Sequence, residues 1–328
     1  MPSYEAGIGT FYGNPTHGLV KESVIGTPSK EISLDELDSA IKRSLITITL
    51  NQHPITGLFS AATKEHHDEN RHYNHYWLRD GAIIILALND PSMRETYPQD
   101  SRVGKLINRI TTKWLKGMFK LISGPEWQRG FSQEIIKSDP QNTDNNYTYL
   151  ADLYKAPPVH VKTDGSLCEG WSDQNQPDAW GLFFSAVASA VPNVSYTMTD
   201  KEQEALESSV EYLVRTEPEH FEGSPMWEGL PVHNPPSLST VALFKDITPY
   251  VSPRLKVPLQ RRIQNADDFI NNQYPADYTI PKNHDSKSDT ATLVALAHGA
   301  LNGLPLSKYL IKSTQEFGNG HIGQIRFI

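Results

Sequence analysis

The sequence predicts an all-α protein, and three observations support that fold class. Apolar residues recur at helical spacing along most of the 328 residues. Two of the periodic stretches follow a capping-box signature, in which a serine or threonine precedes a glutamate by three positions. Strand signals are thin, and no proline- or serine-rich linker divides the chain. We therefore expect one domain over residues 1–328, with a poorly structured N-terminal segment at residues 1–30.

The first two helices are predicted on either side of a polar stretch. Ser33 and Glu36 form a capping box, and the β-branched stretch 44–50 continues the same helical phase. A buried helix is predicted within HYWLRDGAIIILAL, residues 75–88, where an apolar run follows a charged pair. Asp80 at that helix start would accept hydrogen bonds from backbone N–H groups and offset the positive end of the helix dipole.

The later helices follow from the same signals. An amphipathic helix begins near Ser101, Thr199 and Glu202 form a second capping box, and Gly318 stands where a C-terminal cap is expected. The apolar stripe of the helix after Ser101 consists of Val103, Leu106, Ile107, Ile110, Trp114, Met118 and Leu121. Further helices are expected over residues 178–191, 199–216, 236–246, 256–273, 285–301 and 305–317.

Long polar or proline-rich stretches separate these helices, over residues 60–75, 138–177, 217–235 and 274–285. Loops of this length are uncommon in compact domains unless they build a functional site. The side chains of these loops are therefore the first candidates for chemistry.

Composition and charge exclude several classes of partner. The net charge is −8 and no stretch clusters lysine and arginine, so no nucleic-acid partner is expected. No apolar segment reaches the roughly 18 residues of a membrane-spanning helix, so no membrane partner is expected. The N-terminus shows no signal peptide, which favours a cytoplasmic protein if this N-terminus is genuine. A single cysteine excludes an internal disulfide framework.

Two motifs suggest a metal or a nucleotide but lack the required context. EHHDENRHYNH gathers His66, His67, His72 and His75, yet the spacing matches neither HExxH nor a zinc finger. GNGHIG satisfies GxGxxG but follows a predicted helix instead of a strand. Cys168 shows no pairing with a histidine and an asparagine, so we interpret it as a structural or idle thiol. We therefore expect no metal and no cofactor.

The first long loop ends in residue types that suit a carbohydrate. Tyr73 and Trp77 supply flat surfaces for the apolar face of a sugar ring. Arg79 and Asp80 supply fixed donors and acceptors for neighbouring hydroxyls. The second loop repeats this theme of an aromatic residue and a carboxylate before an apolar helix, with Trp171 and Asp178 in the stretch EGWSDQNQPDAWGLFF.

For Asp178, which follows Pro177, a role as a helix cap explains the residue equally well.

The third loop offers a candidate general acid. Glu228 lies between Trp227 and Gly229 in SPMWEGLPVHNPP. A carboxyl group held against indole and aliphatic groups has a raised pKa, because its ionised form loses hydration. A general acid near neutral pH requires such a carboxyl group. The alternative is a solvent-facing loop glutamate with no role in chemistry.

Taken together, the three loops resemble glycoside hydrolase family 15, which includes glucoamylases, bacterial trehalases and glucodextranases. Related domains occur in the α and β regulatory subunits of phosphorylase kinase. The matching blocks are Tyr73-Asn-His-Tyr-Trp77-Leu-Arg79-Asp80, which is similar to Y-x-x-x-W-x-R-D, then Trp171 to Gly181, then Met226-Trp227-Glu228 with His233. They stand in the order of the family and spread over about 160 residues, which makes the combination more specific than any one block.

The resemblance implies an (α/α)6 barrel with a pocket at one end. It also implies inverting hydrolysis of a terminal α-glucosidic bond in a maltooligosaccharide or starch-like glucan, a dextran or trehalose. Glu228 would be the acid, and a carboxylate roughly 6.5–9.5 Å away would activate water. Arg79 and Asp80 would bind hydroxyls of the terminal glucose. The other sugar-contacting positions would be Tyr73, Trp77, Trp171, Asp178, Trp227 and His233.

This sequence departs from the family pattern in two ways. Gly229 stands where many members have a second glutamate after the acid. The general base of the family lies between the last barrel helices, so we expect it beyond Ile328, in a barrel whose last helices are missing from a truncated chain. A truncated enzyme would lose activity. Both departures leave open a non-catalytic relative that binds glycan or a partner protein, as the kinase regulatory subunits do. They also leave open a helical scaffold in which each carboxylate only caps a helix.

Overall fold

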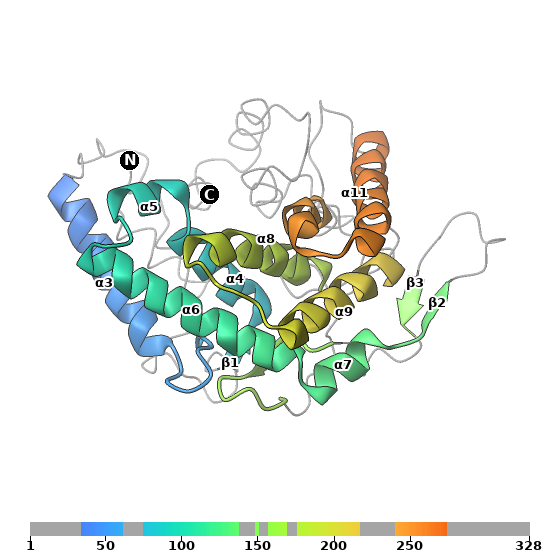
Figure 1. The fold of residues 1–328 in the computed structure, drawn as a ribbon, viewed down its shortest axis with the longest axis horizontal. Coiled ribbons are helices and arrows are strands. Elements are labelled where there is room, and N and C mark those ends of the chain that lie inside the picture. The colour runs from blue at the N-terminus through green and yellow to red at the C-terminus, as the bar shows by residue number, and fades with distance from the viewer. Residues whose placement is uncertain are drawn as a thin grey trace, which may run out of the picture.

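The computed structural model describes residues 34–61, 75–137, 148–150, 157–168, 176–216 and 240–273. Its helices are α3 (Leu34–Asn51), α4 (Leu78–Leu88), α5 (Pro91–Thr96), α6 (Arg102–Ile122), α7 (Pro125–Phe131), α8 (Pro177–Asn193), α9 (Asp200–Thr216), η4 (Thr240–Tyr250) and α11 (Pro253–Gln273). Its strands are β1 (His75–Trp77), β2 (Ile135–Lys137), β3 (Thr148–Leu150) and β4 (His160–Lys162). The prediction of a mostly helical protein is confirmed (Figure 1).

Several predicted helix boundaries are confirmed by their capping contacts. The Ser101 hydroxyl accepts a hydrogen bond from Gly104 N at 2.9 Å and starts α6. Glu202 accepts from Thr199 N at 2.8 Å, and Glu202 N donates back to the Thr199 hydroxyl at 3.3 Å, as a capping box requires. The stretch 44–50 lies within α3, as predicted. Helical phase outweighed the β-branched composition there.

Some boundaries differ from the prediction. The helix expected over 236–246 is described as a 3-10 helix, η4, from Thr240 to Tyr250. The short helices α5 and α7 were not predicted, although each begins with proline at its first position and Asp90 caps α5 by accepting from Ser92 N at 2.9 Å. The predictions for residues 1–30, Ser33, 285–301, 305–317 and Gly318 lie outside the described residues.

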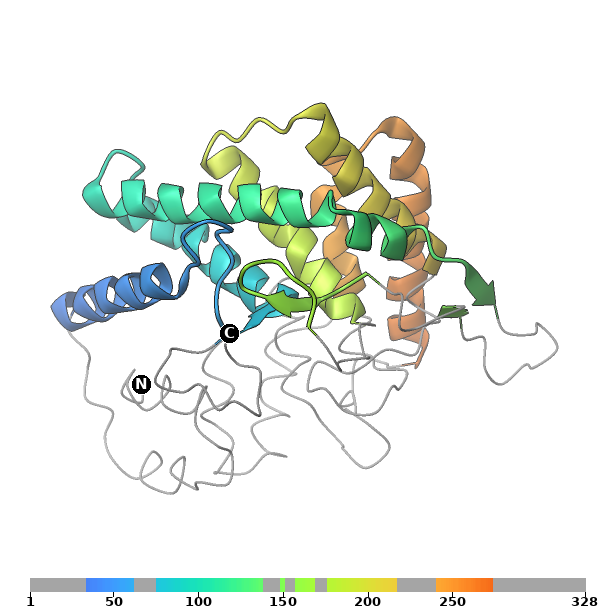
Figure 2. The same cartoon turned by 90° about the horizontal axis from the view of Figure 1, so that it is seen from below.

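Helix α8 lies at the centre of the molecule. It is apolar around most of its circumference, with Trp180, Phe183, Val187 and Ala190 among its buried residues, which is the pattern of a helix covered on several sides. It packs most extensively against α4 and η4 and also contacts α6. Figure 2 shows α6 crossing the pair formed by α4 and α8.

The helices form two layers that alternate along the chain. Helices α4, α8 and η4 form an inner layer, while α3, α6, α9 and α11 lie outside them, with α6 against α9 and α9 against α11. This alternation of inner and outer helices is the arrangement that an (α/α) barrel repeats. Closure into a six-fold ring stays a prediction, because it depends on parts of the chain outside the described residues.

An aromatic cluster joins the layers. The Trp180 ring meets those of Trp127, Phe131 and Phe183 edge to face, with centroids 5.4–5.8 Å apart. Edge-to-face pairs of this kind add stabilisation beyond the apolar area that they bury. In the predicted stripe of α6, Ile107, Ile110, Trp114 and Met118 are buried. Val103, Leu106 and Leu121 are only partly buried at the edges of that face.

The four strands are three residues long and form two antiparallel pairs, β1 with β4 and β2 with β3. Strands β3 and β4 lie within the predicted loop over 138–177, β2 ends directly before that loop, and β1 occupies the first three residues of the stretch 75–88, within which a helix was predicted. In the described part of the chain, no helix combines the length and apolar character that a bilayer crossing would need.

Candidate functional site

The first candidate element is the junction between β1 and α4. Strand β1 pairs with β4 in the register Tyr76↔Val161, and Leu78 N donates to Val159 O at 2.8 Å. Trp77 is the N-cap residue, with an extended backbone at φ −113° and ψ 131°. Arg79 therefore occupies the second position of α4. The pairing of β1 with β4 fixes where that helix begins.

Asp80 lies in the first turn of α4, at its third position, and not at the cap itself. The sequence interpretation of Asp80 as the capping residue was wrong in this detail, because the chain stays extended through Trp77. A carboxylate in the first turn still complements the positive end of the helix dipole. Arg79 and Asp80 are both half-buried, and both take part in interactions within the structure.

Helix α8 begins in a similar way. Gln176 is its N-cap residue without a side-chain cap bond, Pro177 occupies the first position and Asp178 the second. Proline is favoured at a first position because its missing N–H would have no helical partner there. Asp178 thus belongs to the first turn and is not the cap.

The two inner helices α4 and α8 run in the same direction. Tyr76, which precedes α4, accepts a hydrogen bond from Trp114 Nε1 at 3.2 Å, and the Trp114 ring contacts that of Phe183 in α8. At their far ends, Asn193 Nδ2 donates to Asn89 O at 3.3 Å. The first turns of α4 and α8 therefore lie toward one end of the pair. We call this end, with β1 and β4, the strand end, and the opposite end the asparagine end.

Packing explains why a glycine, Gly81, follows Arg79 and Asp80. The Tyr76 ring lies on α4 at Gly81, where an added Cβ would lie 2.3 Å from Tyr76 Cε2 and 2.6 Å from its hydroxyl oxygen. Burial raises the pKa of the Tyr76 phenol well above its usual range, so the ring remains neutral. Gly81 is thus required by a buried tyrosine ring that packs against α4 at this position.

Trp77 is less accessible than a sugar-stacking residue was expected to be. Its ring stacks on the His160 imidazole with centroids 4.1 Å apart and an interplanar angle of 26°, and only 5% of the residue is exposed. One face of the indole is therefore covered by β4. The predicted role of Trp77 in lining a sugar site stays a prediction.

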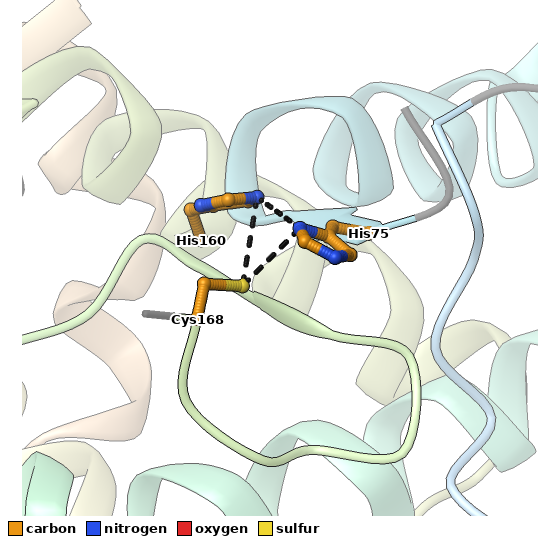
Figure 3. Close-up of side chains that lie close together, drawn as sticks. All are labelled: His75, His160 and Cys168. Atoms are coloured by element: carbon orange, nitrogen blue, oxygen red, sulfur yellow. Dashed lines mark hydrogen bonds between the residues drawn. The ribbon is translucent and has the colours of Figure 1, made fainter. Parts of the chain in front are cut away.

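A group of three side chains at the strand end was not expected from the sequence. His75 Nδ1 lies 2.9 Å from His160 Nε2, and Cys168 Sγ lies 3.3 Å and 3.7 Å from these two nitrogens (Figure 3). The sequence predicted a structural or idle thiol at Cys168 and no metal, and it gave no sign that this cysteine lies beside two histidines. Burial, reinforced by Asp164 and opposed by Lys162, raises the pKa of the Cys168 thiol to about 11.

The three residues of this group are far apart in the sequence. His75 belongs to the histidine-rich stretch, but its neighbours in space are 85 and 93 residues away. The spacing of His160 and Cys168 matches no standard ligand motif. The pairing of β1 with β4 brings the two histidines together, and a bridge between Val161 and Leu167 returns the chain to β4 directly before Cys168.

The remaining predicted site residues are not placed. Tyr73, Trp171, Trp227, Glu228 and His233 lie outside the described residues, as do His66, His67 and His72 of the histidine-rich stretch. Of the predicted sugar-binding positions, the structure describes Trp77, Arg79, Asp80 and the backbone of Asp178, and it brings their helix starts to the strand end.

Comparison with known proteins shows a shared fold. No protein-family model and no curated protein matches the sequence. A solved structure of a wild-type glycosidase matches with a TM-score of 0.61 and 15% identity over 86% of this chain and 70% of that chain. A glutamate-to-alanine variant of a glycosidase in complex with glucose matches with a TM-score of 0.62, 15% identity and the same coverage. A tyrosine-to-phenylalanine variant gives a TM-score of 0.63 at 14% identity, also over 86% and 70%. At these identities the likeness concerns the fold.

Proposed function

We propose that this chain is a glycosidase of the glucoamylase type, which releases terminal glucose from α-linked glucosides with inversion at the anomeric carbon. The observation that carries the proposal is the parallel course of α4 and α8. It brings the start that bears Arg79 and Asp80 and the start that bears Asp178 to one end of a fold shared with glycosidases. One of the matching structures is a complex with glucose.

In this proposal, Arg79 and Asp80 hold the hydroxyls of the terminal glucose. The guanidinium group donates in a fixed fork and the carboxylate accepts, so the pair suits two neighbouring hydroxyls. Half-burial at the helix start supports this role, because it limits the motion of both groups and strengthens their hydrogen bonds relative to those in water. Arg79→Lys would lose the fork and weaken sugar binding.

Glu228 is the proposed general acid. It protonates the oxygen of the leaving sugar while a second carboxylate, later in the chain in the family pattern, removes a proton from the attacking water. The water oxygen bonds to the anomeric carbon from the face opposite the leaving group, so an α-linked substrate gives β-glucose.

The test uses this chain extended to the length of the family's catalytic domain, so that the general base is included, with maltooligosaccharides, isomaltooligosaccharides of the dextran type and trehalose. NMR of the first product formed is expected to show β-glucose. Glu228→Gln is expected to lower kcat on these substrates by about 10²–10⁴-fold. It should lower kcat far less on an aryl α-glucoside whose leaving group needs no proton. Glu222→Gln, in the same sequence stretch, is the matched control and should retain activity.

A second assay separates loss of the base from loss of the site. α-Glucosyl fluoride needs no acid, and azide can replace the water that the base activates, giving β-glucosyl azide and fluoride. Formation of that product without turnover of natural substrates would support a sugar site that lacks its base. No hydrolysis, no azide product and no binding of an acarbose-like inhibitor would overturn the proposal.

Binding of the inhibitor with neither reaction would instead favour the non-catalytic glycan-binding relative, to which Gly229 already points.

A further inference from the structure

Three potential ligand atoms converge between β1 and β4. His75 comes from the first residue of β1, His160 from the first residue of β4, and Cys168 from the segment that follows the turn after β4. Their ligand atoms lie within 4.8 Å of one another, and Figure 3 shows the two ring nitrogens and the sulfur facing a common centre. We propose that His75, His160 and Cys168 bind a zinc ion at this point.

The distances fit a tetrahedral ion. Zinc bonds of roughly 2.0–2.1 Å to nitrogen and 2.3 Å to sulfur separate neighbouring ligands by about 3.3 Å between nitrogens and about 3.5 Å between nitrogen and sulfur. The observed separations are 2.9 Å for the nitrogen pair and 3.3 and 3.7 Å for the two nitrogen–sulfur pairs. Shifts of a few tenths of an ångström would bring the three atoms onto one coordination sphere.

Hydrogen bonding alone satisfies this triangle poorly. Each ring nitrogen offers, in the ring plane, either one proton or one lone pair. His75 Nδ1 faces both His160 Nε2 and Cys168 Sγ, so it can make one well-aligned hydrogen bond to this group and not two. A cation at the centre accepts one lone pair from each of the three atoms.

The types of ligand favour zinc. Imidazole suits zinc, copper, iron and nickel, whereas thiolate selects softer ions and disfavours magnesium and calcium. On binding, Cys168 loses its thiol proton to solvent and forms a zinc–sulfur bond, while both imidazoles bind in their neutral form. The zinc charge of +2 and the thiolate charge of −1 leave a site of +1, with water as the expected fourth ligand.

A zinc ion at this site would link the segment that leads into α4 to the segment that leads into α8. Strand β1 leads through Trp77 directly into α4, and the Trp77 ring stacks on His160 itself. Strand β4 and Cys168 belong to the stretch that leads into α8. Because the β1–β4 pair is only three residues long, a metal bridge would fix the first stretch against the second more firmly than the strand pairing alone.

The experiment measures metal binding by the full 328-residue chain, freed of metal with a chelator. One equivalent of Zn²⁺ is expected to bind and to raise the melting temperature. Co²⁺ in its place is expected to give the visible bands of a tetrahedral ion and a near-ultraviolet thiolate-to-cobalt band. Because the chain has one cysteine, that last band can arise only from Cys168.

Variants test each ligand. Cys168→Ser is expected to abolish the thiolate band, and Cys168→Ser and His160→Gln to weaken Zn²⁺ binding by about 100-fold or more. His53→Gln is the matched control, because His53 is not one of the three converging residues and its Nδ1 accepts from Thr56 N at 3.2 Å. This variant should bind zinc as the wild type does.

Several results would overturn the proposal. One is the absence of the thiolate band at saturating Co²⁺. Another is an unchanged zinc affinity in Cys168→Ser, because it would indicate that zinc binds to other histidines at the surface. If a variant fails to fold, X-ray absorption of the zinc-loaded wild type decides, since it must show one sulfur at about 2.3 Å. These readouts do not depend on glycosidase activity, so failure of the proposed function would leave them unaffected.

Discussion

The two ends of the α4–α8 pair are built from polar residues in different ways. At the asparagine end, Asn89 donates to Ile85 O at 2.8 Å and to the Thr111 hydroxyl at 3.3 Å, and it accepts from Arg94. Arg94 also donates to Asn108 at 2.5 Å. Asn89 thus bonds to the backbone of the helix that it ends and to α6, and Arg94 of α5 bonds to Asn89 and to α6. These contacts hold helix ends together, although Arg94 Nε is buried without a hydrogen-bond partner.

At the strand end, similar atoms face one another instead of complementary partners. Two ring nitrogens and a sulfur point to one centre, and a guanidinium and a carboxylate are only half-buried at a helix start. The contacts at the asparagine end join helices to one another, whereas the atoms that converge at the strand end are of the types that bind a metal ion. This difference separates a structural end from a candidate functional end.

The largest stability effect is expected at the asparagine end. Asn89→Ala should lower the free energy of unfolding by about 2–3 kcal/mol, because it removes the acceptor for Arg94 Nη2 and the donor to the buried Thr111 hydroxyl. Urea denaturation measures the change. Sugar and zinc binding by the folded Asn89→Ala variant should not change. Asn89→Asp keeps an acceptor for Arg94, so its free energy of unfolding is expected to fall less. Altered ligand binding in folded Asn89→Ala would remove the distinction between the two ends.

The next effect concerns the strand end. Gly81→Ala should destabilise the protein by about 1–3 kcal/mol, because the new Cβ would overlap the buried Tyr76 ring. Unlike Asn89→Ala, it should also weaken sugar binding, since relief of the overlap moves the first turn of α4. Repeating the substitution in a Tyr76→Val background, by denaturation and calorimetry, is the control. A penalty of the same size in both backgrounds would show that the tyrosine ring is not its cause.

The smallest change in the free energy of unfolding is expected in the outer layer. It serves as a reference for the changes expected at the two ends of the α4–α8 pair. Half-buried Glu207 in α9 accepts from Ser252 N at 2.9 Å and from Gln203 Nε2 at 3.1 Å. Burial would raise the Glu207 pKa, but these hydrogen bonds and Arg254 outweigh it, so the pKa lies below its usual value. Glu207→Gln should cost about 1 kcal/mol near neutral pH.

The pH dependence of this contact follows from the direction of the shift. Because the folded pKa of Glu207 is lowered, its stabilisation is complete above the ordinary glutamate pKa and is lost as pH falls through the folded value. The difference in unfolding free energy between wild type and Glu207→Gln should therefore be constant at neutral pH and shrink in acid. A difference that grows in acid would contradict the assigned contacts.

Much of the fold could be predicted because helices are specified by neighbours in sequence. The capping box at Thr199 and the stripe after Ser101 are formed by residues within a turn or two of each other, and both are found in the structure. The short strands could not be predicted, because β1 needs a partner 85 residues away. The type of η4 also differed from the expectation of an ordinary helix.

The candidate site divides in the same way. Arg79 and Asp80 could be singled out because a charged pair before an apolar run is a local pattern, and both lie in the first turn of a helix that begins two residues before Asp80. The role of Gly81 and the cover over Trp77 depend on Tyr76 and His160, whose positions follow from packing. Glu228 remains a prediction from sequence.

The sequence by itself determined where helices begin, which faces they bury and which residues resemble a sugar site. These properties depend on periodicity and on capping contacts between near neighbours, and both are written directly in the order of residues. Only the tertiary structure decided that α4 and α8 run in the same direction and that a cysteine joins two histidines. Convergence of residues distant in sequence arises from the packing of whole helices and from strand pairing, which no local pattern encodes.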